Sequence, residues 1–458
     1  MIARRLWLCA TAMSFIAGCA SVGPDYVRPA PVISAEFKEL KGWKAATPRD
    51  TEPKGEWWRV FEDPELNRLE EQVAVSNETL AADEANFRSA VALVAEARAA
   101  LYPGVNFNPT ISRSGPNNDL TNVQLSASWT LDIWGKTRRA IEEQGALAEE
   151  SAADLANARL AAQSALALAY VSLRQADSLR ALLISTVGQY RRALDIAQNQ
   201  YNAGTNAESD VITAKTQLLG AEAQEINTGV ARATSEHAIA VLIGRPPAAL
   251  DIGRGALAQG IPNIPVGLPS SLLERRPDVA AGERLMMAQN AAIGVAVAGY
   301  YPSFTLNGAA GYLGDPFIKQ IVGANPAWSF GLALAQPLFN GGLTAAQVDA
   351  ARASYDASVA TYRATVLTAL QQVEDALSTL RVLGQEEKIQ QEAVASARQA
   401  VQIALNEYAA GTQNFTTVDT AQATALADEQ SALSTRAQRL TAAINLIVAL
   451  GGGWHDEP

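Results

Sequence analysis

Hydrophobic and polar residues follow two different rhythms along this chain. Over long stretches the apolar residues recur at steps of three and four, as at Leu166, Ala169 and Leu173, which is the spacing of one helix face. Ahead of these stretches, apolar and polar residues alternate without a break in NVQLSASWTLDIW at 122–134. Alternation is the period of a strand with one apolar face. The pattern therefore predicts paired strands followed by long amphipathic helices.

Proline marks where these helices can lie. It is absent from 117–245 and again from 338–457, and both tracts are rich in residues that favour helices. Long helices are predicted at about 136–201 and 344–406. Shorter return helices follow them at about 209–243 and up to about Leu450. The first long helix would be about 100 Å in length, which exceeds an ordinary globular domain.

A short phrase occurs twice in the helical tracts. YNAGTNAESDVITAKTQ occupies 201–217 and YAAGTQNFTTVDTAQAT occupies 408–424, an offset of about 207 residues that indicates an internal duplication. Glycine is favoured where a helix ends with positive φ. Each phrase is therefore predicted to be a turn that joins two long antiparallel helices, once in each half of the chain.

Strand pairs are predicted at about 104–134 and 303–339. Outside the N-terminal leader, no stretch of the sequence reaches the roughly 20 apolar residues of a spanning helix, so a membrane crossing would have to use strands. Four strands cannot close a sheet alone. Two chains would give a barrel filled by side chains, and three would give twelve strands with a lumen. In the alternative interpretation, the hairpins cover a soluble core.

The predicted fold class is therefore mainly α with a membrane β-barrel. It is a trimeric tube with four strands per chain, a 12-stranded barrel and long antiparallel helical hairpins, with an internal duplication. Aromatic residues near the strand ends are assigned to the membrane interface: Trp129, Trp134, Trp328 and Phe339.

The N-terminus reads as a secretion signal, with Arg4 and Arg5 before an apolar run. Ile16-Ala17-Gly18-Cys19 resembles the bacterial lipobox, which predicts cleavage after residue 18 and lipidation, including palmitate, of Cys19. Ala20 in place of Asp is consistent with transport to the outer membrane, by analogy with lipoproteins. The alternative is an ordinary cleaved signal with an incidental cysteine.

These observations divide the chain into five predicted segments. They are a signal peptide at 1–18, a lipidated N-terminal and equatorial segment at 19–65, a first structural repeat at 66–260 with its tip at about 202–210, a second repeat at 261–451 with its tip at about 409–417, and a tail at 452–458.

Charge and chemistry narrow the function. The formal net charge is −11, which argues against nucleic acid as a partner. The only histidines are His237 and His455, and the sequence holds no phosphate loop, metal-ligand cluster or nucleophile motif. No enzyme activity, cofactor or metal is expected. The run from Arg275 to Asp278 is interpreted as a helix start, since proline favours the first turn.

Several motifs together resemble one family. The lipobox, WWRVFEDPELNRLEEQV at 57–73, LDIWGKTRR at 131–139, LLERRPDVAAGERLMMAQNAAIGVAVAGYYP at 272–302 and the paired Ala-Gly-Thr turns are similar to TolC-like outer membrane factors, in particular the NodT-type efflux lipoproteins. The resemblance implies a homotrimer in outer membrane lipid, whose helical hairpins form a periplasmic tunnel. It also implies a periplasmic adaptor protein and an inner-membrane pump of the resistance-nodulation-division class.

The same resemblance implies that the turns are periplasmic tips, which contact the adaptor and narrow the aperture. The residues concerned are Gly204, Thr205, Asp210, Gly411, Thr412 and Asp419. Asp210 matches an acidic position common in the family. At the second tip the chain departs from the family, because Thr420 stands where relatives often carry Asp.

The expected function is a passive outer membrane conduit of a tripartite pump that exports small molecules, such as drugs or other toxic compounds. A duct for type I protein secretion is the alternative, and a neighbouring pump gene would distinguish the two. A lipid-anchored helical scaffold or a periplasmic enzyme, neither with a pore, is the more distant alternative.

Overall fold

The computed structural model describes residues 21–28, 55–113, 119–262, 264, 275–314 and 326–452. The chain forms two compact units, and each unit draws on both halves of the sequence. Unit 1 comprises Met1–Val32, Glu84–Asp154 and Asp278–Val366, and unit 2 comprises Ile33–Asp83, Leu155–Pro277 and Leu367–Pro458.

Helices make up most of the described chain. Their bounds are η1 Trp57–Phe61, α2 Pro64–Ser76, α3 Glu78–Ala99, α4 Lys136–Asn202, α5 Glu208–Leu242, η2 Pro247–Ala249, α7 Pro277–Val297, η3 Ala298–Tyr300, α9 Leu343–Ala409 and α10 Phe415–Ala449. The helices α4 and α9 have 67 residues each, and α5 and α10 have 35 each. The four long helices begin and end at the offset of the repeated phrase, which confirms the duplication.

Capping residues explain where several helices begin and end. Asp63 accepts hydrogen bonds from the backbone N–H groups of Glu65 and Leu66, at 2.9 and 3.2 Å, and thereby starts α2. Gly244 and Gly451 follow the last residues of α5 and α10 with φ of +65° and +88°, a conformation that glycine adopts without strain. A Cβ on Gly244 would lie 1.9 Å from the carbonyl oxygen of Ser76, so only glycine fits there.

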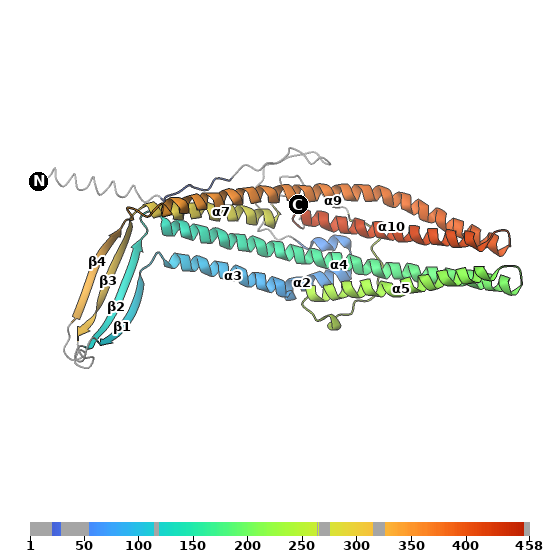
Figure 1. The fold of residues 1–458 in the computed structure, drawn as a ribbon, viewed down its shortest axis with the longest axis horizontal. Coiled ribbons are helices and arrows are strands. Elements are labelled where there is room, and N and C mark those ends of the chain that lie inside the picture. Colours follow the sequence, from blue (N-terminus) through green and yellow to red (C-terminus); the bar gives the residue numbers. More distant parts are fainter. Residues whose placement is uncertain are drawn as a thin grey trace. The chain divides into compact units, whose positions relative to one another are not determined.

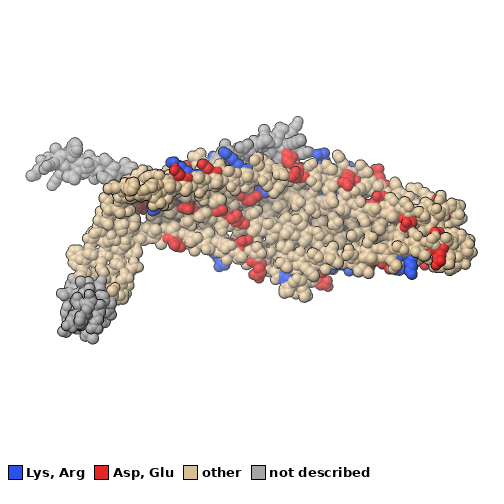
Figure 2. All heavy atoms as spheres, viewed as in Figure 1, with Lys and Arg blue, Asp and Glu red and all other residues tan. Residues whose placement is uncertain are grey.

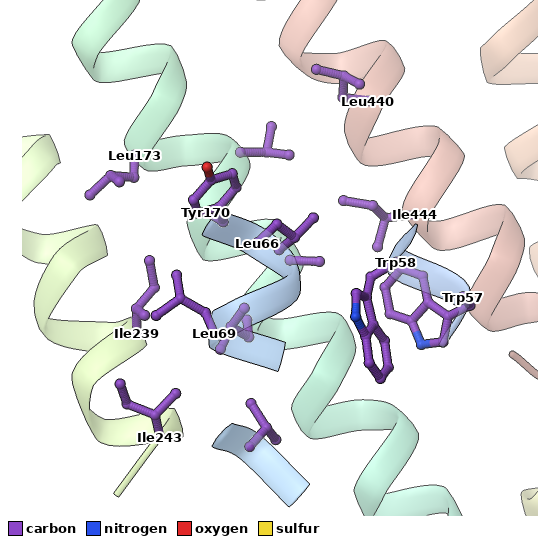
Figure 3. Packing of buried hydrophobic residues seen from close by; sticks show 14 of the residues in the cluster. Trp57, Trp58, Leu66, Leu69, Tyr170, Leu173, Ile239, Ile243, Leu440 and Ile444 are labelled. Atoms are coloured by element: carbon purple, nitrogen blue, oxygen red, sulfur yellow. The ribbon is translucent and has the colours of Figure 1, made fainter. Parts of the chain in front are cut away.

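The main hydrophobic cluster of unit 2 joins short and long helices (Figure 3). Leu66 and Leu69 of α2 are buried between Tyr170 of α4 and Ile239 of α5. Trp57 and Trp58 of η1 pack edge to face, with ring centroids 5.9 Å apart, and belong to the same cluster. These two tryptophans are therefore core residues.

The strands form one antiparallel sheet in unit 1. Its strands are β1 Gly104–Arg113, β2 Asp119–Leu131, β3 Ser303–Gly314 and β4 Pro326–Ala335, in the order β1-β2-β3-β4 (Figure 1). Pro109 and Pro326 lie in the two outer strands of the four, and Pro326 is the first residue of β4, positions at which a strand tolerates proline. The central ladder, between β2 and β3, joins the two halves of the sequence.

The two faces of this sheet differ in polarity. Directly paired residues share a face, and Trp129 pairs with Leu306, which in turn pairs with Leu332. On the opposite face Ser128 Oγ donates a hydrogen bond of 3.0 Å to Asn307 Oδ1. In the view of Figure 2, charged side chains gather over the helices and none appears on the strands. Among the described residues, no helix combines the length and the hydropathy that crossing a membrane requires.

Together, the duplicated helical hairpins and the four antiparallel strands confirm the predicted fold class at the level of the chain.

Candidate functional site

The two turns between the long helices have the same backbone geometry. Gly204 and Gly411 have φ of +71° and +74°. In the first turn, the N–H and Oγ1 groups of Thr205 donate to the carbonyl oxygen of Gln200, at 3.0 and 2.9 Å. In the second, Thr412 makes the same two bonds to Glu407, also at 3.0 and 2.9 Å. Glycine and threonine thus close the end of each long helix.

The turns also bind each other within unit 2, where Figure 1 shows them side by side. The amide Nε2 of Gln200 donates a hydrogen bond of 2.9 Å to the carbonyl oxygen of Tyr408. Its Oε1 accepts a 2.7 Å bond from Asn206 Nδ2 in its own turn. Gln200 therefore links the first helical hairpin to the second through a single side chain.

Tyr408 forms the apolar centre of this contact. Its ring is fully buried and packs edge to face on Phe415, with centroids 5.2 Å apart. Its hydroxyl donates a 3.4 Å hydrogen bond to Asp210 Oδ2. Burial, the largest effect, and the nearby Asp210 carboxylate raise the pKa of the Tyr408 hydroxyl, although Asn206 opposes the shift. The hydroxyl therefore remains a neutral donor at physiological pH.

The structure places Asp419 one helical turn inside α10, apart from the Tyr408 and Asp210 pair. Its backbone carbonyl accepts a 3.3 Å hydrogen bond from Gln217 Nε2 of α5, which is a second link between the hairpins. Thr420 is exposed, and its hydroxyl donates to the carbonyl oxygen of Thr416 at 2.9 Å. The hydroxyl of Thr420 is therefore hydrogen-bonded within its own helix.

Sequence reasoning missed Gln200, Asn206 and the role of Tyr408 in this contact. A signal for Tyr408 was present at the position that follows each turn. There the second repeat has Phe415 whereas the first has the charged Glu208. An aromatic residue at only one of two matching positions indicates that only one of the two repeated tyrosines is buried.

In each helical hairpin an ion pair joins the long helix to its return helix, and the two pairs occupy equivalent positions in the two repeats. Arg191 Nη2 lies 2.8 Å from Glu222 of α5, and Arg398 pairs with Glu429 of α10 at the corresponding position. An open groove of about 740 Å³ runs alongside, lined by residues of α4, α9 and α10. No group of His, Cys, Asp and Glu suited to a metal ion occurs among the residues that the structure describes.

The four aromatic residues assigned to the membrane interface fall into two groups. Trp129 and Trp134 are half-buried, and their indole N–H groups donate to the carbonyl oxygens of Leu101 and Pro302, at 2.9 and 2.8 Å. Trp328 and Phe339 are 80% and 91% exposed. Cys19, the predicted lipidation site, lies outside the described residues.

Comparison with known proteins gives one consistent family. The model of the family "Outer membrane efflux protein" matches residues 69–245 and 268–452, once in each repeat. TtgF, a toluene efflux pump outer membrane protein of Pseudomonas putida, is 30% identical, over 96% of this chain and 95% of its own. TtgC, a toluene efflux pump outer membrane protein of the same species, is 27% identical, over 97% of this chain and 95% of its own.

The fold agrees with the sequence comparison. The solved structure of the outer-membrane channel OprN superimposes with a TM-score of 0.86 at 28% identity, over 95% of this chain and 100% of that one. The resemblance to TolC-like proteins is thereby confirmed, and the expectation of a channel rather than an enzyme is confirmed with it. The chain belongs to the outer membrane efflux protein family and is the outer membrane channel component of an efflux pump.

Proposed function

We propose that three copies of this chain assemble into one conduit that passively exports small molecules to the cell exterior. The observation that carries the proposal is the sheet, with one apolar face and two edge strands, β1 and β4, that pair on one side only in the described chain. Edges exposed to hydrocarbon would leave backbone groups without hydrogen bonds. Three sheets of four strands give a closed barrel with a lumen.

The partners follow from the position of the turns at the ends of the long helices. A periplasmic adaptor protein contacts the tips through Gly204, Thr205, Gly411 and Thr412, with Asp210 and Asp419 nearby. The adaptor connects the conduit to an inner-membrane pump of the resistance-nodulation-division class, which supplies the energy. Apart from the glycines' own chain neighbours, no atom lies within 4 Å of the position of a Cβ on either tip glycine, so the tips leave room for a partner.

The cargo class is supported by the relatives. Two of the proteins most similar to this chain are named as toluene efflux pump components. Small apolar organic molecules are therefore the proposed cargo. Acyl chains on Cys19, after removal of residues 1–18, anchor the conduit to the outer membrane in addition to its sheet.

The first test is the native mass of the full-length protein extracted from outer membranes in detergent. A trimer is expected, since only three copies give twelve strands. A monomer that stays soluble after the detergent is removed would mean that the four strands need no partner chain, and the conduit would have to be abandoned.

The second test adds a side chain to the tips without removing their fold. Asparagine tolerates positive φ better than most residues, so Gly204→Asn combined with Gly411→Asn keeps both turns and fills the space beside them. Export of toluene by cells with the complete pump should fall at least about tenfold, which corresponds to about 1.4 kcal/mol of lost adaptor binding.

The matched control is Gly188→Asn, because Gly188 lies within α4 and also has open space around it. This variant should export as the parent does. Full export by the double tip variant, with normal amounts of trimer, would exclude the tips as the adaptor contact.

A further inference from the structure

Residues 21–28, here called the N-terminal strap, belong to unit 1 and contact α4 and α7. The backbone N–H of Val22 donates a 3.0 Å hydrogen bond to the carbonyl oxygen of Trp134. The buried Asn290 of α7 donates from Nδ2 to the carbonyl oxygen of Pro24, at 3.0 Å. Arg28 closes the other end with an ion pair of 2.7 Å to Glu283.

One buried arginine contacts three residues of the strap. Arg139 of α4 is 4% exposed, and its Nε donates to the carbonyl oxygen of Val22 at 3.2 Å. Its Nη2 reaches the carbonyl oxygen of Gly23 at 3.5 Å and Asp25 Oδ1 at 2.8 Å. Its Nη1 pairs with Glu142 at 2.7 Å. The planar guanidinium thus joins α4 to three strap residues at once, since its donors point in several fixed directions.

Glycines allow the backbones to approach closely at this contact. Gly23 has φ of +96°, and a Cβ there would lie 2.5 Å from the Cα of Gly294 in α7. A Cβ on Gly294 would lie 2.8 Å from Cγ of Arg139. Gly135, with φ of +80°, leaves no room for a Cβ beside Ser21. Three glycines around one arginine make a fitted site for the strap.

The strap begins where the strands end. Trp134, which accepts the bond from Val22, donates its indole N–H to the carbonyl oxygen of Pro302 at 2.8 Å, immediately before β3. Its ring stacks on Tyr301, with centroids 4.8 Å apart. Cys19 precedes Ser21 by two positions, and two residues span at most about 7 Å. The first described residue of the strap, Ser21, lies against Gly135, shortly after the end of β2.

We propose that Arg139 holds the N-terminal strap against α4 and α7, and that the bound strap fixes the height at which acyl chains on Cys19 enter the membrane. The second part rests on the proposed lipidation of Cys19. The acyl chains then insert beside the periplasmic ends of the strands. The lipid anchor and these strand ends therefore lie in the same leaflet of the outer membrane, the one that faces the periplasm. Arg139 is a positioning residue for the anchor, since it acts through the strap.

The experiment measures hydrogen exchange at the amide of Val22, which donates to the carbonyl oxygen of Trp134, in the purified full-length protein in detergent. Exchange is expected to be slow in the parent and at least about tenfold faster in Arg139→Gln, because the strap then opens locally. The control Lys136→Gln removes a positive charge from the same helical turn, at an exposed residue, and should leave exchange unchanged. Gly23→Ala provides a second disruptive variant, should Arg139→Gln fail to fold.

A second readout reports how deep the start of the strap lies in the membrane. This depth would not change if Arg139 only stabilised the fold. A fluorophore on Ala20→Cys, the position next to Cys19, is quenched by lipids brominated at defined acyl positions. The parent should show one depth, and Arg139→Gln should show a broad distribution.

Three outcomes would contradict the proposal. Fast exchange in the parent would exclude a bound strap. Slow exchange in both folded variants would exclude the role of Arg139. An N-terminal peptide whose mass shows no acyl chain would refute the lipidation and the fixed height, while the exchange data would still decide whether the strap is bound.

Discussion

At the scale of single residues, Glu70 is the least expected feature. It lies on the buried face of α2 with Leu66, Leu69 and Val73, is fully buried, and neither carboxylate oxygen has a hydrogen-bond partner within the described chain. Burial raises the pKa of Glu70 to about 9. A neutral carboxyl group is therefore the stable form at physiological pH, because an unpaired charge in an apolar cluster is costly.

This burial predicts a pH-dependent stability of unit 2. The folded state binds the proton more tightly than the unfolded chain, whose carboxyl has its ordinary pKa of 4.5. Stability contributed by Glu70 is therefore complete below pH 4.5 and is lost as the pH rises toward 9. The loss is about 1.4 kcal/mol for each pH unit in this window.

Glu70→Gln should remove this dependence and raise the apparent unfolding temperature at pH 8 relative to the parent, with little difference at pH 5. The measurement is thermal unfolding in detergent at one scan rate. Glu71→Gln changes the exposed neighbour in α2 and should follow the parent. Parallel curves for the parent and Glu70→Gln would contradict a protonated, buried carboxyl.

At the scale of elements, one asparagine controls the junction of three helices. Asn77 Oδ1 accepts from the N–H groups of Thr79 and Leu80 at the start of α3, at 2.9 and 3.1 Å. Its Nδ2 donates to the last carbonyl of α5, on Leu242, at 2.8 Å. In the second repeat, Arg276 donates to the carbonyl oxygen of Ala449, the last residue of α10, at 3.0 Å. The last carbonyl of the return helix therefore accepts a side-chain hydrogen bond in both repeats, but the donor residue differs.

Asn77→Ala should destabilise the protein by about 1 to 2 kcal/mol, the usual effect of removing an N-cap side chain. Its unfolding temperature, compared with that of Asn227→Ala on the exposed face of α5, measures the effect. Equal unfolding temperatures for both variants would show that the junction does not depend on Asn77.

The elements themselves could be predicted from the sequence because their signals are local. Apolar spacing, the proline gaps and the repeated Gly-Thr turns located all four long helices within about three residues, which is the ordinary precision for helix ends. Contacts between distant segments could not be predicted. The sequence repeats Tyr201 as Tyr408, yet the first is 40% exposed and the second is fully buried.

The same limit explains why the strap and Gln200 were missed. Arg139 and Asp25 are 114 positions apart, and Gln200 bonds to a carbonyl group 208 positions away. A backbone carbonyl leaves no mark in the sequence. Such contacts depend on the three-dimensional packing of helices whose faces look alike in the sequence.

At the scale of the whole molecule, the opposite faces of β4 are expected to meet different surroundings. Leu332 lies on the apolar face and is directly paired with Leu306, whereas Ser329 lies on the other face, paired with Ala309. In an outer membrane channel the apolar face meets lipid, where a lysine costs about 2 to 4 kcal/mol near the bilayer midplane.

Leu332→Lys should therefore reduce the amount of trimer recovered from outer membranes severalfold, whereas Ser329→Lys, three positions earlier on the same strand, should leave it near the parental level. Quantitative blotting of heat-unmodified trimers measures both. Comparable recovery of the two variants would assign the apolar face to a protein interior instead of lipid.

The ladder between β2 and β3 has a consequence for the order of events during synthesis. Ser128 and Asn307 meet across it although they are 179 positions apart in the sequence, so β2 emerges from the ribosome long before its partner strand exists. The β1–β2 hairpin is local and can form early, but its inner edge stays open until the second half of the chain has been exported. Sheet completion is therefore a late folding step with a high contact order, and the inner edge of β2 has to remain unpaired throughout that interval.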